Sequence, residues 1–481
     1  MHDTQKTGGA RLPEGRLADK AHDADVAVLG FGISNRPLVS ILCALGSHVT
    51  VYDKSSVEQL GDEALSLQAD GVRFTTDMEA ALTPTPVLIF RTPGIRPDLP
   101  AIQKAVLEGA ELTSEMAWFL EATPATVIGI TGSDGKTTTS TLTANMLEAA
   151  GHRVYLGGNI GTPLLPLVAN MTRDDFAVVE LSSFQLCDLP QGAVPHRACV
   201  TNITRNHLNW HVDMAEYTNA KTRIYRGARC TRLVTNADND VTKALAEQEK
   251  GNRPVVSFST KGTPDGTALS VKNGRITLTQ NGQDTPLLAV SDILLPGEHN
   301  VQNYMTAIGL VHDLVTPEAI RTVATTFSGV EHRLERVRTL GGVTYYNSSI
   351  DSTPARTEAA LSALPAATPI VAICGGYDKN SDYAPLATAL ISRVRAVVLT
   401  GATADKILAA LHACPDYAPD RPTVIRQPDF ETAVRAAASL AKEGDAVLLS
   451  PACASFDAFP NFEVRGQTFK RIVNDLDKQD T

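Results

Sequence analysis

Strand-length apolar runs alternate with longer Ala- and Leu-rich stretches of helical periodicity along most of this chain. Such alternation is typical of α/β proteins built on parallel sheets. The pattern divides the chain into three segments, residues 24–117, 118–330 and 331–481, and we expect each to fold as one α/β domain. The preceding residues 1–23 are polar and charged, so we expect them to form a disordered tail.

The first segment opens with a predicted strand at 25–29, a glycine-containing turn at 30–34 and a helix. A second predicted strand, 48–52, is followed by Asp53. This is the beginning of a Rossmann-like nucleotide-binding unit. Its turn lacks a third glycine, and an acid after the second strand also fits NAD, so the turn alone leaves the nucleotide undecided.

The other two segments also alternate strands with helices. The second begins with a strand at 127–131 and contains a more β-rich stretch, 255–288, with Asn-Gly turns at 273–274 and 281–282 that predict hairpins. In the third segment, strands are predicted at 344–347, 369–374, 396–400 and 445–450.

Composition narrows the range of functions. Hydrophobic residues make up 43% of the 481 residues, as in globular proteins, and the net charge of −10 argues against non-specific binding of nucleic acid, which needs a basic face. The apolar runs are too short to cross a membrane. The seven cysteines are dispersed and form no C-x-x-C pair, which predicts buried free thiols in a reducing compartment. The N-terminal residues have no apolar signal-peptide core, so we expect a cytoplasmic location.

The strongest motif is a predicted phosphate loop, Gly129-Ile-Thr-Gly-Ser-Asp-Gly-Lys-Thr-Thr138, between a strand and a helix. Its glycines let backbone amides converge on phosphate, the helix N-terminus adds partial positive charge, and Lys136 adds a full charge. A strict Walker pattern has glycine where this chain has Ile130, so the loop is a variant. The residues expected to bind ATP are Gly132, Ser133, Asp134, Gly135, Lys136, Thr137 and Thr138.

Two oxygen ligands near this loop predict magnesium. The hydroxyl of Thr137 is placed to bind Mg²⁺, and Glu180 follows the apolar run 176–179 at the tip of a buried strand. Hydroxyl and carboxylate oxygens suit this cation, which would neutralise phosphate charge.

The phosphate loop, with further motifs in family order over residues 25–473, resembles the Mur ligases of peptidoglycan synthesis. These further motifs lie at 157–161, 180–185, 202–207, 220–221, 295–300, 332–333, 449–455 and 461–466. The resemblance implies an N-terminal Rossmann-like domain that binds UDP, a central P-loop ATPase α/β domain, and a C-terminal Rossmann-like domain that binds the incoming amino acid.

The same resemblance assigns catalytic and metal-binding residues. Thr137 and Glu180 would hold a first Mg²⁺, His207 would bind a second, and Lys221 matches the lysine that these enzymes carbamylate. Carbamylation turns an ammonium into an anion that can support a cation. His332 matches a position that orients the reaction centre or assists proton transfer.

A zinc site is the alternative for the histidine pair at 207 and 211, which has helical spacing. No third ligand is evident in the sequence, and we expect His211 to be structural.

The remaining assignments concern nucleotide and substrate. Asn300 and Asn303 match the adenine side of the ATP site, and Arg333 matches an arginine that reaches the phosphates. The expected UDP contacts are Ser34, Asp53, Lys54, Thr92, Pro93 and Gly94. The expected muramoyl-peptide contacts are Asn159, Ser182 and Ser183. The expected amino-acid contacts are Ser352, Arg356, Lys379, Ser455 and Phe462, with Lys379 meeting the side-chain carboxylate of glutamate.

One motif departs from the family pattern. Well-known members have Asn-Asp-Ser-Lys where this chain has Asn347-Ser-Ser-Ile350. An isoleucine cannot hold phosphate, so Asp351 and Arg356 are candidates to replace the missing acid and cation. A subgroup of the same enzymes also has isoleucine at this position, so the departure does not by itself imply inactivity.

The resemblance is greatest to members that add D-glutamate to UDP-N-acetylmuramoyl-L-alanine, using ATP and two Mg²⁺ ions. It implies a monomer that forms an acyl phosphate, releases ADP and phosphate, and closes around its small-molecule substrates by hinging near 329–332.

Three alternatives stay open at this point. The chain could be a Mur-type ligase with another acceptor or amino acid. It could be an NAD oxidoreductase, which would leave the phosphate loop unexplained. It could also be a catalytically silent nucleotide-binding protein, because Ser348 and Ile350 replace the usual acid and lysine.

Overall fold

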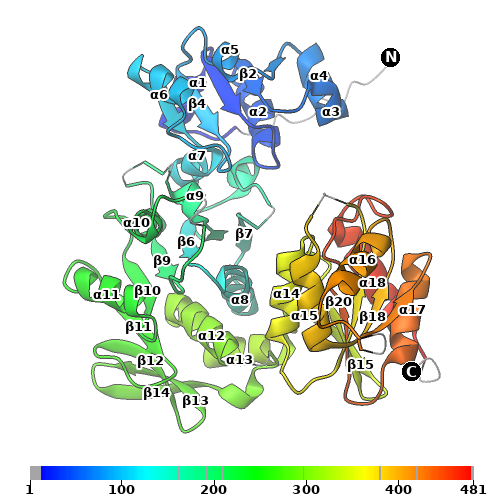
Figure 1. The fold of residues 1–481 in the computed structure, drawn as a ribbon. Helices are drawn as coiled ribbons and strands as arrows, with labels where there is room; N and C mark the ends of the chain where they lie inside the picture. Colours follow the sequence, from blue (N-terminus) through cyan, green and yellow to red (C-terminus); the bar gives the residue numbers. More distant parts are fainter. Residues whose placement is uncertain are drawn as a thin grey trace, which may run out of the picture. The chain divides into compact units, whose positions relative to one another are not determined.

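The computed structural model describes residues 12–160, 162–187, 189–190, 192–207, 210–295, 297–378, 381–418 and 421–477. The chain forms two compact units that divide between Phe327 and Ser328. The first unit contains two sheets and the second contains one, and all three are mainly parallel (Figure 1). The predicted α/β fold class is therefore confirmed.

The N-terminal sheet has five parallel strands in the order β3-β2-β1-β4-β5. Its strands are β1 (Asp25–Leu29), β2 (His48–Tyr52), β3 (Arg73–Thr75), β4 (Leu88–Arg91) and β5 (Glu111–Thr113). Its helices are α2 (Asn35–Ala44), α3 (Val57–Leu60), α4 (Asp62–Ala69), α5 (Met78–Ala81) and α6 (Pro100–Leu107). The chain proceeds from β1 to β2 on one side and returns to β4 on the other. This reversal is the switch point at which nucleotides bind such sheets.

The prediction that residues 1–23 form a disordered tail is wrong for one short segment. Residues Arg16–Ala21 form helix α1, in which the side chains of Leu17 and Ala21 are fully buried. Lys20 pairs with Glu111 of β5 at 2.9 Å. Two apolar side chains four residues apart share one helix face, and their burial stabilises an otherwise polar segment. Residues 1–11 lie outside the described part of the chain.

The central sheet has nine strands in the order β14-β13-β12-β11-β10-β9-β6-β8-β7. Its strands are β6 (Thr126–Thr131), β7 (Val154–Gly158), β8 (Phe176–Glu180), β9 (Arg197–Val200), β10 (Arg232–Asn236), β11 (Val255–Ser259), β12 (Thr267–Lys272), β13 (Arg275–Gln280) and β14 (Gln283–Ala289). Its helices include α8 (Lys136–Ala149), α9 (Ser183–Leu186), α10 (Met214–Thr222), α11 (Asp240–Glu249), α12 (Glu298–Val311) and α13 (Pro317–Thr326).

The two hairpins predicted in this sheet are confirmed. Strands β12 and β13 pair antiparallel, as do β13 and β14. The turn residues Asn273 and Gly274 have φ of 50° and 71°, and Asn281 and Gly282 have φ of 53° and 76°. Two successive positive φ values form a type I′ turn, which asparagine and glycine adopt at low cost.

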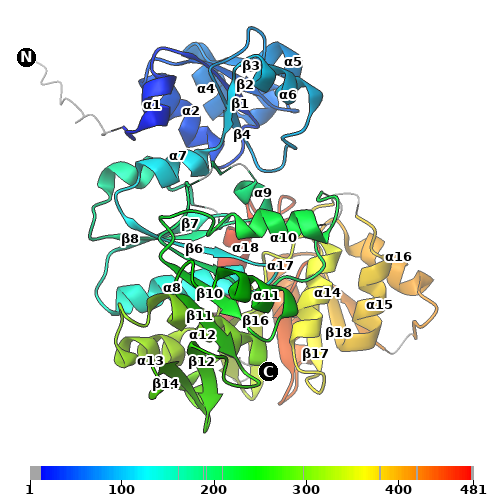
Figure 2. The ribbon, with the colours of Figure 1, turned by 90° about the vertical axis from the view of Figure 1, so that its left-hand side faces the viewer.

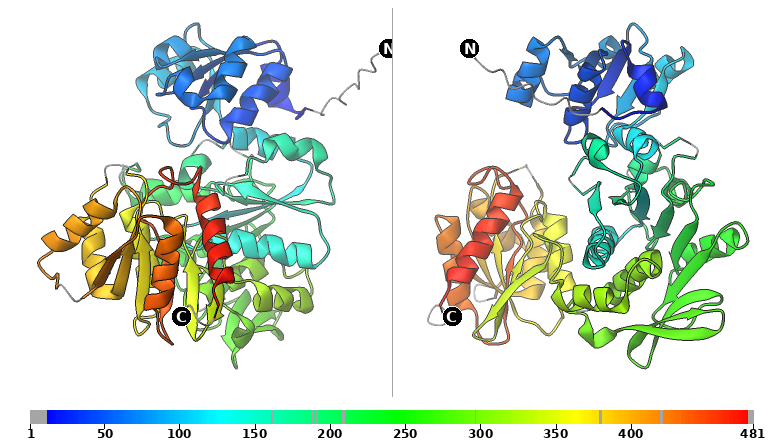
Figure 3. Two further views of the ribbon diagram at one scale, coloured as in Figure 1. Left: turned by 90° about the vertical axis from the view of Figure 1, so that its right-hand side faces the viewer. Right: turned by 180° about the vertical axis from the view of Figure 1, so that it is seen from behind.

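The sheet of the second unit has the order β15-β16-β20-β17-β18-β19. Its strands are β15 (Glu335–Leu340), β16 (Val343–Asn347), β17 (Ile370–Cys374), β18 (Val394–Leu399), β19 (Thr423–Arg426) and β20 (Ala446–Leu449). One apolar cluster joins the sheet to α14 (Pro354–Ala363), α15 (Ala384–Arg393) and α16 (Ala404–Ala413), and another joins it to α17 (Phe430–Leu440) and α18 (Phe462–Asp475). Helices α14 and α15 lie side by side in Figure 2, and α17 and α18 do so in Figure 3. Helices thus cover both faces.

Two predictions from composition have structural outcomes. All seven cysteines are free, as expected, and Cys199, Cys230, Cys374 and Cys453 are buried. The other three are partly exposed, so the predicted burial is wrong for them. Among the residues that the structure describes, no helix is both long and apolar enough to cross a membrane.

Glu115, the first residue of α7 (Glu115–Ala122), gives the fold a pH dependence. The carboxyl group is buried and accepts one hydrogen bond, from Leu165 N at 3.2 Å. Burial raises its pKa to about 7. In this range the folded state binds more protons than the unfolded state, so rising pH lowers the free energy of unfolding.

We therefore expect Glu115→Gln, which has no charge to bury, to stabilise the protein at alkaline pH. Its advantage over the wild type should grow by roughly 2–3 kcal/mol between about pH 5 and pH 8. Urea unfolding at several pH values measures this difference. A constant difference across that range would show that Glu115 has an ordinary pKa.

Candidate active site

The predicted phosphate loop connects β6 to the N-terminus of α8, so its prediction from sequence agrees with the local structure. Gly132 and Gly135 have φ of 149° and 77°, and a Cβ at either would overlap Thr201 or Asn303. The Lys136 ammonium donates to Gly132 O at 3.1 Å and Ser133 O at 2.9 Å. The loop thus holds a cation beside the amide groups of the helix N-terminus, which is an arrangement suited to phosphate.

The loop is held in place by Thr201, Asn202 and Tyr217, which had no predicted role. Asn202 Oδ1 accepts from Asp134 N at 3.0 Å, and the Thr201 hydroxyl donates to Asp134 O at 2.6 Å. The hydroxyls of Ser133 and Tyr217 are 3.0 Å apart. Thr201 and Asn202 directly follow β9, which pairs with β6. Their position as polar residues at the end of a predicted strand is the sequence feature that could have identified them.

The structure brings together the two residues predicted to bind the first magnesium ion. Strand β8 pairs in parallel with β6 and ends at Glu180, which is 2% exposed. The Thr137 hydroxyl donates to Glu180 Oε2 at 2.8 Å, and Asn159 Nδ2 donates to Oε1 at 2.8 Å. A hydroxyl and a carboxylate at the mouth of a phosphate loop are hard oxygen donors, and these fit Mg²⁺. Asn159, predicted to contact substrate, orients this carboxylate.

Lys221 on α10 is a buried amine next to the loop. Its side chain is 1% exposed and donates to Gly132 O at 2.7 Å, and its Nζ lies 4.7 Å from the centre of the Tyr217 ring. Burial, followed by repulsion from Lys136, lowers its pKa to about 7. Among the described residues no carboxylate lies within ion-pair distance of it. With a pKa of about 7 the amine is about half neutral at that pH, and the neutral form is a nucleophile able to react with carbon dioxide.

The two histidines after β9 have different environments. The ring of His207 packs edge-on against Phe184 at 5.0 Å, and its pKa is lowered by burial and then by Lys221 and Lys136. His211 is 1% exposed and its Nε2 lies 2.9 Å from Ser183 Oγ.

The zinc alternative gains no support from this arrangement. Within the described part of the chain, neither histidine belongs to a group of three close His, Cys, Asp or Glu ligand atoms. The structural role of His211 stays a prediction, and its buried ring contacts the hydroxyl of Ser183.

The predicted adenine-side residues lie on α12 beside the loop. Asn303 Oδ1 accepts from the Thr139 hydroxyl at 3.4 Å, and its Nδ2 donates to Asn300 Oδ1 at 3.2 Å. Both side chains are buried. Residues far apart in sequence therefore meet at Gly135, as a shared nucleotide site requires. Arg333 belongs to the second unit.

The predicted UDP residues gather at the switch point of the N-terminal sheet. Asp53, after β2, accepts from Phe31 N at 2.8 Å and from Ser55 N at 3.0 Å. Gly30, after β1, approaches the side chain of Thr92, after β4, so closely that a Cβ would overlap it. The other predicted contacts, Ser34, Lys54, Pro93 and Gly94, belong to the same loops. Carboxyl ends of adjacent parallel strands are where such sheets bind nucleotides.

The predicted amino-acid site corresponds to the loops that follow β16, β17 and β20. Gly375 N donates to Pro451 O at 2.8 Å, and the Ser349 hydroxyl donates to Phe462 O at 2.8 Å. The buried Arg465 guanidinium donates to Ser349 O and Ala454 O. These bonds join the loops that carry Ser352, Ser455 and Phe462. Lys379 lies outside the described residues.

The departure from the family pattern has a structural consequence. Ser348 Oγ accepts from Leu334 N at 3.1 Å. Asp351 is buried, accepts from the Ser450 hydroxyl at 2.8 Å, and has a pKa raised by that burial. Arg356 at the start of α14 donates to Ile350 O at 3.1 Å. The carboxyl group of Asp351 is thus part of the packed interior, whereas Arg356 is exposed and carries positive charge beside the altered motif.

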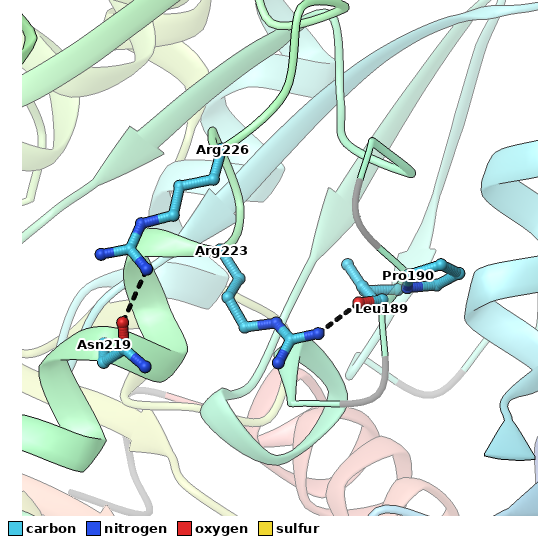
Figure 4. A pocket seen from close by; sticks show the side chains of 5 residues that line it. All are labelled: Leu189, Pro190, Asn219, Arg223 and Arg226. Atoms are coloured by element: carbon cyan, nitrogen blue, oxygen red, sulfur yellow. Dashed lines mark hydrogen bonds between the residues drawn. The ribbon is translucent and has the colours of Figure 1, made fainter.

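A separate pocket of about 320 Å³ lies at the end of α10 (Figure 4). Its lining residues are Leu189, Pro190, Asn219, Arg223 and Arg226. Arg223 donates to Leu189 O, and Arg226 donates to Asn219 Oδ1 at 2.6 Å. None of the described residues that line this pocket was predicted for the active site.

Comparison with solved structures supports the fold. A UDP-N-acetylmuramoyl-L-alanyl-D-glutamate–2,6-diaminopimelate ligase matches with a TM-score of 0.54 at 16% identity, covering 94% of this chain and 93% of that one. UDP-N-acetylmuramate-alanine ligase MurC from Thermotoga maritima matches with a TM-score of 0.51 at 18% identity, covering 94% and 99%. These likenesses concern architecture.

Sequence comparison identifies the family. Residues 130–311 match the Mur ligase middle domain, and residues 332–453 match the Mur ligase, glutamate ligase domain. The UDP-N-acetylmuramoylalanine–D-glutamate ligase of Clostridium novyi is 43% identical over 95% of this chain and 98% of its own length, and that of Acetivibrio thermocellus is 42% identical over the same shares. With relatives this similar over nearly their whole length, the chain belongs to the Mur ligase family.

Proposed function

We propose that this protein is a cytoplasmic ATP-dependent ligase that adds D-glutamate to UDP-N-acetylmuramoyl-L-alanine during synthesis of peptidoglycan precursors. The observation that carries the proposal is the hydrogen-bonded pair of Thr137 and Glu180 beside the phosphate loop. The chain is also 43% identical to a ligase named for this reaction. Free cysteines agree with a reducing compartment.

The reaction in this proposal has two steps. The terminal carboxylate of the acceptor attacks the γ-phosphorus of ATP, the bond to ADP breaks, and an acyl phosphate forms. The neutral amine of glutamate then attacks the acyl carbon, and the tetrahedral intermediate expels phosphate and loses a proton. Phosphoryl transfer depends mainly on position and charge stabilisation, which Lys136 and the loop amides supply.

Magnesium ions would supply further charge neutralisation at the phosphates. Thr137 and Glu180 would hold one ion, because their oxygens already face each other. His207 and Lys221, the latter as a carbamate, would hold a second. Carbamylation joins the Lys221 nitrogen to the carbon of CO₂ and releases one proton. Lys221 is buried, and no carboxylate of the described residues lies within ion-pair distance of it; this supports the assignment, because a buried ammonium is costly.

The substrate contacts follow from the loops at the strand ends. In the proposed enzyme, Asp53 and the 92–94 loop recognise uridine, Ser182 and Ser183 contact the muramoyl peptide, and Lys379 meets the glutamate side chain. Arg356 replaces the cation lost at Ile350, because its guanidinium is exposed beside that residue.

A panel assay tests the proposed specificity. Phosphate release is measured with UDP-N-acetylmuramate, its L-alanyl and L-alanyl-D-glutamyl derivatives, and a folate, each with D-glutamate, L-glutamate, L-lysine or diaminopimelate. We expect turnover with UDP-N-acetylmuramoyl-L-alanine and D-glutamate to exceed every other combination, and mass spectrometry identifies the product. If another acceptor and amino acid give the highest turnover, the protein is a Mur-type ligase of different specificity. Ser348 and Ile350, which replace the usual acid and lysine, are the reason to test this alternative.

A further inference from the structure

The pocket at the end of α10 is lined by two arginines and an asparagine that the chain places on one side of this helix (Figure 4). Asn219 and Arg223 are four residues apart, so they share one face of the helix. Arg226 N donates to Arg223 O at 3.3 Å, and this three-residue turn brings the Arg226 side chain to the same face. Two guanidinium groups and one amide therefore line a single pocket.

Helix α10 separates this pocket from the phosphate loop. Lys221 is two residues away from both Asn219 and Arg223, which corresponds to a rotation of about 200° around the helix. The Lys221 ammonium donates to Gly132 O at 2.7 Å, whereas Arg223 donates to Leu189 O. The two side chains thus leave the helix in opposite directions, and the pocket is distinct from the proposed ATP site.

The two arginines of the pocket carry positive charge that no acid balances. Among the residues that the structure describes, neither Arg223 nor Arg226 has a carboxylate within ion-pair distance. Their hydrogen bonds go to uncharged oxygens, one of a main-chain carbonyl and one of a side-chain amide. Arg253 in the same unit, by contrast, pairs with Glu249 at 2.7 Å. In a chain with a net charge of −10, the pocket is a local concentration of positive charge.

The position at the end of a helix does not by itself account for both arginines. The C-terminus of a helix carries about half a negative elementary charge, which favours one basic side chain without any ligand. Two full positive charges exceed this partial charge, so an anion in the pocket is attracted. A guanidinium also has five N–H donors in a planar fork that matches two oxygens of a phosphate or carboxylate group. The bonds to Leu189 O and Asn219 Oδ1 each involve a single nitrogen of the fork.

The size and the apolar wall of the pocket indicate an organic ligand. Its volume of about 320 Å³ is at the lower end of the range for small-molecule sites and is roughly ten times the space of one water molecule. Leu189 and Pro190 line it together with the polar residues. A bare ion would leave these apolar side chains in contact with water, whereas the carbon part of an organic anion would cover them.

We propose that this pocket binds a small organic oxyanion. Its phosphate or carboxylate group lies against the guanidinium groups of Arg223 and Arg226, its carbon part packs on Leu189 and Pro190, and Asn219 bonds a polar substituent. The site goes beyond the proposed ligase reaction, whose substrates are assigned to other residues. The inference does not depend on that function, because binding to the pocket and ligation can be measured separately.

Nuclear magnetic resonance of the arginine side chains tests the site directly in the full-length protein. After labelling with ¹⁵N-arginine, the Nε–H signals of Arg223 and Arg226 are assigned from the variants Arg223→Gln and Arg226→Gln. The wild type is titrated at low ionic strength with glycerol 3-phosphate, citrate or inorganic phosphate. We expect both signals to shift in a saturable way with an organic probe. No shift of either signal with any probe at concentrations up to about 10 mM would overturn the inference.

Arg226→Gln measures the part of the second guanidinium. Arg226 is exposed, so its replacement leaves the core intact, and the Arg223 signal still reports binding. We expect the dissociation constant of the preferred probe to rise by at least about 10-fold, because a charge-assisted hydrogen bond is lost. Arg275→Gln is the matched control, since Arg275 is exposed on β13 and its loss changes the net charge equally. Wild-type affinity in Arg226→Gln, or equal weakening in both variants, would overturn the site.

The three probes distinguish the kind of ligand. Tighter binding of glycerol 3-phosphate indicates a phosphate ester, and tighter binding of citrate indicates a polycarboxylate, and either result supports the proposal. Inorganic phosphate that binds as tightly as both would show that the apolar wall contributes nothing, which overturns the organic ligand. A ligase assay on the same samples separates the two proposals. Activity without shifts at Arg223 and Arg226 overturns this inference alone, and shifts in an inactive protein overturn only the proposed function.

Discussion

Replacement of Lys136 by alanine is expected to abolish product formation, lowering kcat/KM by on the order of 1000-fold or more. The ammonium is held by Gly132 O and Ser133 O at the N-terminus of α8. The whole chain has a net charge of −10, so binding of a nucleoside triphosphate depends on local positive charge. Loss of the one lysine in this loop removes that charge at the place where the proposed function has the phosphoryl group transferred.

Steady-state kinetics and ATP titration calorimetry measure this effect. Lys243→Ala is the matched control, because Lys243 is exposed on α11 and its removal changes the net charge by the same amount. Circular dichroism verifies that both variants are folded. If Lys136→Ala keeps more than about a tenth of the wild-type kcat/KM, the loop is not the site of phosphoryl transfer and the proposed function fails.

Lys221 is expected to be the second residue whose loss is severe. Both Lys221→Ala and Lys221→Arg should lower kcat by on the order of 100-fold or more. Arginine keeps the positive charge but cannot form a carbamate under these conditions. Equal loss in the two variants therefore points to the carbamate, whereas activity in Lys221→Arg would show that a cation suffices.

The pKa of Lys221 determines the direction in which activity should change with pH. With a pKa lowered to about 7, the ammonium form dominates at more acidic pH, and an ammonium does not react with carbon dioxide. Activity without added bicarbonate should therefore fall as the pH is lowered from about 8 to 6, and added bicarbonate should restore part of it. A ¹³C signal of a carbamate after incubation with ¹³C-bicarbonate, absent in Lys221→Arg, measures the modification.

Local sequence patterns predicted several elements closely. Strands β1 and β2 have the predicted bounds, and a helix, α8, follows the phosphate loop as predicted. The two Asn-Gly turns form the expected hairpins. These features depend on residues close together in the chain, whose spacing sets which side chains share a face or adopt positive φ.

Other elements could not be predicted in this way. Strands β15 and β19 lie at the two edges of the last sheet, and half of their side chains or more are not buried, so no apolar run marks them. Helix α1 was predicted to be part of a disordered tail, because its few apolar side chains pack against residues that are distant in the sequence.

The sequence by itself determined the chemical groups: the phosphate loop, its lysine, the acid at Glu180 and the buried-strand pattern of three α/β segments. Only the tertiary structure decided how these groups behave. Lys221 has a pKa of about 7 because it is buried against Gly132 and Tyr217, and the Glu180 carboxylate is held by hydrogen bonds from Thr137 and Asn159. Protonation and orientation depend on contacts between residues far apart in the chain, which only the folded molecule brings together.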